Sequence, residues 1–287
     1  MKIIQIFGKK FIQKKINIRN NTNKFLTATN IIFNIHNKKF MKIVFNKFLS
    51  KLLPSKSINS TKWAKEMSLC NNTKFLKIID SSFYKKIEEY EIKPLKNEIE
   101  NILPKIPKIL RYAASNYELL YFIMRKFKPN NVLETGVAIG YSSCFILAGM
   151  KKNNYGKLFS SDFHYLGVKD SKKYIGFLPK KLKYGGDWSL LINGDEFNIP
   201  KFLNIIGNNK IDFFHYDSDK SYRGKLNTMN LVNKNTTKDT VYVFDDIQDD
   251  FFFRDFVKKK NLKHIIIEVD NKNKFCGIAG NFLNYYF

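Results

Sequence analysis

One short stretch, residues 130–145, constrains the fold of this chain more than any other. It reads Asn-Asn-Val-Leu-Glu-Thr-Gly-Val-Ala-Ile-Gly-Tyr-Ser-Ser-Cys-Phe, in which an apolar run ends at Glu134 and two glycines follow, Gly136 and Gly140, separated by three residues. The next residues are apolar and have helical character. The order strand, glycine turn, helix is typical of an α/β domain whose bare backbone lies against a ligand. We therefore predict a ligand cradle at residues 134–142.

The spacing of these glycines separates the segment from the dinucleotide cradle. Dinucleotide-binding domains need Gly-x-Gly-x-x-Gly, whereas this chain has Gly-x-x-x-Gly, so a nicotinamide cofactor is disfavoured. Glu134, at the carboxyl end of the strand, can accept a hydrogen bond from a hydroxyl or ammonium group of a ligand. The stretch Glu-Thr-Gly-Val-Ala-Ile-Gly-Tyr-Ser resembles the first motif of the class I S-adenosylmethionine (SAM) dependent methyltransferases, and its Gly-Tyr-Ser end resembles their O-methyltransferase branch.

Further apolar runs follow in chain order, and most of them end in acids. Together with 132–134 they give seven strand candidates, at residues 157–162, 188–195, 211–217, 240–246, 265–269 and 275–279. Helical patterns lie between them at 141–150, 222–231 and 251–260, and a capping box at Ser115 opens a helix over 119–127. The resemblance implies an α/β, doubly wound, mostly parallel seven-stranded sheet, the Rossmann-like methyltransferase fold.

Two of the strand-end acids are candidates for binding the nucleoside of a cofactor. Asp162 ends the second strand, 28 residues after Glu134, where an acid can accept hydrogen bonds from ribose hydroxyls; the alternative is a residue that caps the following loop. Asp195 follows the third strand, and the resemblance places it near adenine. The resemblance thus implies that SAM contacts six residues: Glu134, Gly136, Gly140, Ser142, Asp162 and Asp195.

Three carboxylates, Asp217, Asp245 and Asp246, end neighbouring strands and should converge at one edge of the sheet. Their hard oxygens suit Mg²⁺ or another divalent cation, which would lower the pKa of a substrate hydroxyl. The alternative is that they cap the helices that follow. Lys220 could act as a general base if its pKa were depressed, or it could be a solvated residue at a helix start.

Residues 217–222, Asp-Ser-Asp-Lys-Ser-Tyr, resemble the Asp-x-x-Lys-x-x-Tyr segment of metal-dependent catechol-type O-methyltransferases. The match makes Asp217 a metal ligand, Lys220 the catalytic base and Asp245 a second ligand. Tyr222 comes one residue early, and Asp246 stands where those enzymes usually have Asn. A bacterial group of class I methyltransferases is more similar still, through its Trp-x-Leu-x-x-Gly-Asp, Asp-Ser-Asp-His-Ser-Tyr and Asp-Asp-Ile segments, although Lys220 replaces the His.

The charge of the chain divides it into regions. The net charge is +25, yet residues 1–65 hold 15 Lys or Arg and no acid, so the excess lies at the N-terminus. We expect a flexible extension over 1–65 that is helical or disordered, a helical lead-in over 66–114 and the methyltransferase domain over 115–287. The extension could instead touch an anionic membrane or act as a targeting peptide, and Met41 is an alternative start.

The function that the resemblance implies is SAM-dependent O-methylation of a small molecule in the cytoplasm. Three distant cysteines favour a reducing compartment, and no apolar run is long enough to span a membrane. One alternative is an RNA methyltransferase, which the charge favours, although Asp-Ser-Asp-Lys stands where base-methylating enzymes carry an Asn/Asp-Pro-Pro-aromatic segment. Another is an inactive binding protein with this fold. We expect no specific nucleic acid partner, and the oligomeric state is open.

Overall fold

The computed structural model of the chain describes residues 27–28, 31, 37, 40–42, 44–45, 58–111, 116–165, 168, 170–269 and 273–287. The chain divides into two compact units. The larger unit combines residues 50–163 with 174–287 and holds the sheet and every predicted site residue. In the smaller unit, which combines residues 1–49 with 164–173, the ring of Phe40 stacks on His164, with 5.8 Å between their centroids.

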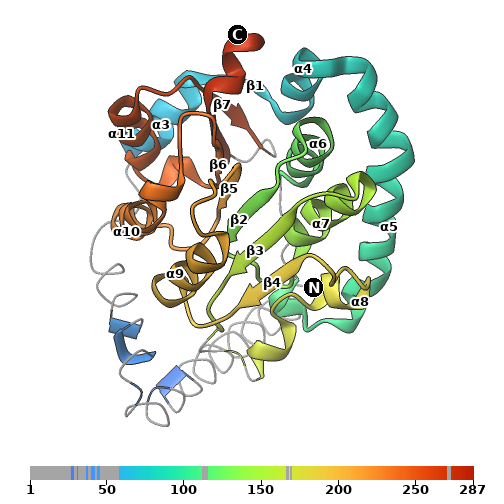
Figure 1. Cartoon of the computed structure of the whole chain (residues 1–287), viewed down its shortest axis with the longest axis vertical. Helices are drawn as coiled ribbons and strands as arrows, with labels where there is room; N and C mark the ends of the chain where they lie inside the picture. The colour runs from blue at the N-terminus through green and yellow to red at the C-terminus, as the bar shows by residue number, and fades with distance from the viewer. Residues whose placement is uncertain are drawn as a thin grey trace, which may run out of the picture. The chain divides into compact units, whose positions relative to one another are not determined.

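The larger unit is built on one eight-stranded sheet with the order β1-β7-β8-β6-β5-β2-β3-β4 (Figure 1). All pairs are parallel except those of β8, which is antiparallel to β6 and β7. This confirms the mostly parallel, doubly wound fold. Its strands are β1 (Ser68–Asn71), β2 (Asn131–Thr135), β3 (Lys157–Ser161), β4 (Trp188–Leu191), β5 (Phe213–Tyr216), β6 (Val241–Phe244), β7 (His264–Glu268) and β8 (Phe275–Ala279).

Helices cover both faces of the sheet (Figure 1). On one face lie α6 (Tyr117–Phe127), α7 (Tyr141–Asn153) and α8 (Phe177–Lys181), and on the other α9 (Asp195–Ile206), α10 (Tyr222–Val232) and α11 (Phe252–Lys260). Every residue of β2, β5, β6 and β8 is buried, as expected of strands covered on both sides. The predicted strands after residue 130 are therefore all present.

The region before residue 115 departs from the prediction in two ways. Residues 68–71 form an eighth strand, β1, which pairs with β7 at the edge of the sheet and follows α3 (Ile58–Met67). A proline lacks the N–H of an interior helical position, so Pro94 would be expected to end a helix. Instead α4 (Asn72–Ile87), which is kinked at Asp80, the π-helix η1 (Glu88–Ile92) and α5 (Lys93–Ile102) follow one another without an intervening loop, and Pro94 lies in the first turn of α5.

A polar contact ties η1 to α6. Arg125 donates from Nε to Oε2 of Glu91 (2.8 Å) and from Nη2 to Oε1 (3.2 Å), while the Tyr121 hydroxyl donates to the same carboxylate (2.6 Å). The Glu91 and Arg125 side chains are only 13% and 18% exposed. The two parallel bonds fix the helical lead-in against the helix that precedes β2.

We expect Arg125→Lys to lower the free energy of unfolding by about 1–2 kcal/mol, because a lysine cannot make both bonds of the planar fork. Urea unfolding followed by circular dichroism measures the change. Lys93→Ala is the control: Lys93 pairs with Glu88 and Glu89 at the surface, so its loss should change little. Equal stability of Arg125→Lys and the unmodified chain would contradict the role given to this pair.

Within the described ranges, no helix combines the length and the apolar character that crossing a membrane requires. The predicted basic extension, residues 1–65, lies almost entirely outside the described residues. Ser115, the first residue of the predicted capping box, also lies outside them, and Asn116 is the N-cap of α6.

Candidate active site

The glycine loop between β2 and α7 lies where the sequence predicts a ligand cradle. Gly136 and Gly140 have φ of +83° and +87°, in the left-handed region that favours glycine. A Cβ on Gly136 would lie 2.5 Å from the carbonyl carbon of Asp217 and closer still to its oxygen, so the loop runs directly against the end of β5. A Cβ on Gly140 would lie 2.5 Å from Cδ of Pro179 in α8. Gly136 is therefore required by the close approach of the Asp217 backbone, and Gly140 by that of the Pro179 ring.

Glu134 lies beneath this loop and is fully buried. Its carboxylate accepts hydrogen bonds from Ser142 Oγ (2.6 Å), Ser143 Oγ (2.6 Å) and Ser160 Oγ (2.8 Å). Burial raises the pKa of Glu134, but contacts with His215 and the serine hydroxyls outweigh burial and hold it below its usual value. Glu134 and Ser142 thus join the end of β2 to the first turn of α7.

Asp162 and Asp195 bracket the other side of the cradle. Asp162 Oδ2 accepts from the backbone N–H of Val137 (3.0 Å) and Ala138 (2.6 Å), so its carboxylate sits on the glycine loop. Asp195, the first residue of α9, accepts from Ser161 Oγ (2.5 Å) and Ser218 Oγ (2.6 Å). The ends of β3 and β5 are thereby tied to one helix N-terminus.

Lys220 lies among the carboxylates that were predicted to hold a metal. Its ammonium group contacts Asp217 Oδ1 directly and lies 2.9 Å from Asp246 Oδ2. The side chains of Asp217 and Lys220 are about a third exposed, at 30% and 34%, so the pair can be reached from solvent. Burial lowers the pKa of Lys220, but the surrounding carboxylates outweigh burial and raise it well above its ordinary value.

Asp245 faces a different partner. Its Oδ1 accepts from Nδ2 of Asn116 (2.5 Å) and lies 3.7 Å from Nε2 of His215, while Nδ1 of the same ring lies 3.7 Å from Oε1 of Glu134. Burial lowers the pKa of His215, but the two carboxylates outweigh burial and raise it to about 10. A buried imidazolium therefore joins the acid under the cradle to an acid of the predicted metal site.

The structure therefore divides the predicted metal site in two: Asp217 and Asp246 face Lys220, and Asp245 faces His215. Among the residues that the structure describes, no three or more His, Cys, Asp or Glu side chains are grouped so that they could hold a metal ion. For Asp217, burial raises the pKa to about 7 despite the opposing charge of Lys220.

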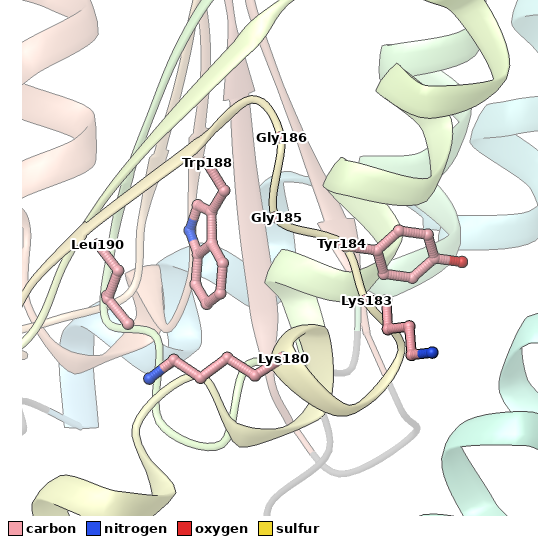
Figure 2. A pocket seen from close by; sticks show the side chains of 7 residues that line it. All are labelled: Lys180, Lys183, Tyr184, Gly185, Gly186, Trp188 and Leu190. Carbon is pink, nitrogen blue, oxygen red and sulfur yellow. The ribbon is translucent and has the colours of Figure 1, made fainter.

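A separate hollow of about 530 Å³ lies at the β4 edge of the sheet, where Trp188 and Leu190 meet Lys180 and Tyr184 (Figure 2). None of the predicted site residues lines it. Trp188 Nε1 donates to Ser160 Oγ (2.9 Å), and Ser160 in turn donates to Glu134, so the wall of the hollow is connected to the cradle through one serine. Residues 183–186, which precede β4, supply several of the lining residues.

Sequence reasoning missed two members of the site, His215 and Asn116. His215 lies within the predicted strand 211–217 and is fully buried, directly beside Glu134 in the β2–β5 register. Asn116 makes no helix-capping bond with its side chain and binds Asp245 instead. In the sequence, the only indication that His215 belongs to the site is that it is a polar residue inside an apolar strand. Its partners could not be predicted because they depend on the order of the strands.

Comparisons with known proteins agree with this fold. Residues 133–247 match a family model described as a methyltransferase domain. An O-methyltransferase from Bacillus cereus solved with SAH is 11% identical, with a TM-score of 0.51 over 70% of this chain and 97% of the other. The O-methyltransferase TomG from Streptomyces achromogenes, solved with SAM, is 14% identical, with a TM-score of 0.51 over 65% of this chain and 88% of the other. Among curated proteins, none matches the sequence.

Proposed function

We propose that this chain, which carries a class I methyltransferase domain, transfers a methyl group from SAM to a hydroxyl oxygen of a small molecule. The observation that supports SAM best is the cradle itself. Gly136 and Gly140 let the loop turn at positive φ against Asp217 and Pro179, and Asp162 lies against this loop at the end of the next strand. The solved B. cereus and S. achromogenes proteins bind SAH and SAM on the same fold.

The residues of the cradle have distinct proposed roles. Asp162 binds the ribose hydroxyls, and Asp195, at the start of α9, borders the adenine. Glu134 accepts hydrogen bonds from the hydroxyls of Ser142 and Ser143 and so holds the first turn of α7 in place. The N–H groups of this turn face the ligand. The cofactor, when bound, supplies an electrophilic methyl group.

The acceptor site that we propose is the partly exposed Asp217–Lys220 pair next to the cradle. Its position at the carboxyl end of β5 places it where doubly wound folds bind their ligands. Because two carboxylates hold Lys220 as an ammonium, we assign it the role of hydrogen-bond donor to the acceptor oxygen. The hydroxyl proton then passes to Asp217, and catalysis rests mainly on the placement of the two reactants.

A divalent cation does not fit these residues as they are arranged. The ammonium of Lys220 lies between Asp217 and Asp246, and Asp245 is engaged by Asn116 and His215. The proposed mechanism therefore routes no step through a metal. Free Cys70, Cys144 and Cys276 are consistent with the reducing, cytoplasmic setting that we propose.

Other partners remain predictions. Contact of the basic segment 1–65 with an anionic membrane concerns residues mostly outside the described ones. Methylation of RNA is the second candidate, favoured by the net charge of +25; it predicts binding that weakens steeply with salt. A binding protein without turnover would differ from both by failing to bind SAM.

Calorimetric titration of SAH into the full chain tests the proposal. We expect micromolar affinity, and we expect Asp162→Ala to weaken it at least about tenfold, because a carboxylate bonded to ribose hydroxyls is worth 1–3 kcal/mol. Asp187→Ala is the matched control, since Asp187 is an exposed acid that precedes β4. Circular dichroism reports whether each variant is folded.

Two results would count against the proposal. If neither SAH nor SAM binds the folded, unmodified chain, the methyltransferase function is wrong. If both bind but Asp162→Ala and Asp187→Ala have equal affinity, the cofactor lies elsewhere than at the end of β3.

A further inference from the structure

The ammonium group of Lys220 provides a positive charge at the proposed acceptor site. Lys220 follows β5 by a short loop, and its ammonium group reaches back to Asp217 on its own loop and across to Asp246 after β6. We propose that this ammonium is a built-in cation that takes the place of a divalent ion between Asp217 and Asp246, so that the acceptor site works without metal. This inference rests on the function proposed above.

The contacts of Lys220 are those of an ion-pair network. One nitrogen lies against carboxylates from two neighbouring strand ends, and it also lies 3.3 Å from the carbonyl oxygen of Asp217. Because the side chains of Asp217 and Asp246 are only 30% and 21% exposed, neither carboxylate is well hydrated, and each gains from a nearby positive charge. The lysine supplies that charge at the position where the sequence predicts an ion.

The third predicted ligand has other partners. Asp245 Oδ1 accepts from Asn116 and faces the buried ring of His215. Asp246 Oδ1, the oxygen not turned to Lys220, accepts from Gln248 Nε2 (3.2 Å). Each of the three carboxylates therefore already has a partner within the chain, and Mg²⁺, which demands near-octahedral oxygen ligation, would have to displace the ammonium.

An ammonium can perform part of the work of a metal. It attracts an acceptor oxygen, donates a directed hydrogen bond to it and stabilises the negative charge that develops there as its proton leaves. Lys220 is a third exposed, so an acceptor can reach it. We therefore expect the acceptor site to need no divalent ion. Once the charge of Lys220 is removed, the same carboxylates should bind a divalent cation.

Mn²⁺ binding to the full chain, followed by the electron paramagnetic resonance signal of free Mn²⁺, tests this inference without any need for turnover. We expect the unmodified chain and Lys220→Arg to bind Mn²⁺ only weakly at this site. Lys220→Met keeps the apolar stem and removes the charge, and it should tighten Mn²⁺ binding at least about tenfold, because a unit charge at contact distance is worth more than that near a protein surface. Adding Asp246→Asn to Lys220→Met should abolish the new binding.

Tight Mn²⁺ binding by the unmodified chain that is lost in Asp217→Asn would overturn the inference, because the carboxylates would then prefer a metal to the lysine. Lack of binding by a folded Lys220→Met variant would also overturn it, because the position would not be a cation site. SAH titration on the same samples keeps the two proposals apart: it tests the cofactor site and does not depend on the Mn²⁺ result.

Discussion

Replacing Gly136 by alanine is expected to abolish SAH binding and to lower the free energy of unfolding by more than about 3 kcal/mol. The added Cβ would lie 2.5 Å from the carbonyl carbon of Asp217 and 3.0 Å from the nitrogen of Ser218. These are backbone atoms held by the pairing of β5 with β2, so they cannot rotate away as a side chain could. The φ of +83° adds strain for any residue with a Cβ.

Thermal unfolding and SAH titration at low temperature, where the variant is still folded, measure the two effects separately. Gly185→Ala is the matched control. No heavy atom lies within 4 Å of the Cβ it would add, so stability should change by no more than about 1 kcal/mol and SAH affinity should be unchanged. A Gly136→Ala variant that binds SAH as well as the unmodified chain would show that the loop is not the cofactor cradle.

Replacing His215 by leucine is expected to destabilise the chain by about 3–5 kcal/mol at pH 7. The imidazole is fully buried and lies 3.7 Å from carboxylate oxygens of both Glu134 and Asp245. Leucine has similar volume but no charge, so both acids would lose their shared cation in the interior. The loss should also disturb the cradle, because Glu134 holds Ser142 and Ser143 at the start of α7.

The direction in which the pKa of His215 is shifted determines how the destabilisation by His215→Leu depends on pH. The pKa of His215 is raised to about 10 in the folded chain, above the value of about 6.5 expected when unfolded. Its stabilising contribution is therefore fully present below pH 6.5 and is lost as the pH rises through 10. The difference in stability between the unmodified chain and His215→Leu should be largest near pH 6 and should shrink towards pH 10.

Urea unfolding at several pH values measures this difference. His264→Leu is the control, because His264 is half-buried at the start of β7 and no carboxylate is paired with it in the described structure. Its substitution should change stability by less than about 1 kcal/mol at every pH. A stability difference for His215→Leu that does not vary between pH 6 and pH 10 would contradict a charged imidazole at this position.

The fold was largely predictable because its signals are local. Apolar runs bounded by acids and turn residues predicted β2 to β8, and the glycine spacing predicted the turn before α7. The strand β1 was missed because Ser-Leu-Cys-Asn is too short to show alternation, and it becomes a strand only by pairing with β7. Pro94 is ambiguous in the sequence because a proline in the first turn of one helix resembles the end of another.

The sequence predicted which acids lie close together, but not which positively charged side chain contacts each of them. Convergence of strand-end acids follows from a parallel sheet, and Asp217, Asp245 and Asp246 do end neighbouring strands. Which positively charged side chain contacts which acid depends on side-chain directions and on strand order. Neither can be read from the spacing of residues along the sequence. Lys220 was therefore predicted to be a base beside a metal or a solvated residue, whereas in the structure it is the positive partner of two carboxylates.

The position of β8 between β6 and β7 determines when the sheet can be completed during synthesis. Ser68 in β1 pairs with Ile266, and β6 takes its second neighbour from residues 277–279. β2 to β5 can assemble as soon as they leave the ribosome, whereas β1 must wait for a partner made nearly two hundred residues later. Until then β6 is an edge strand with unpaired N–H and C=O groups, and the nascent chain is most prone to misassociation at that edge.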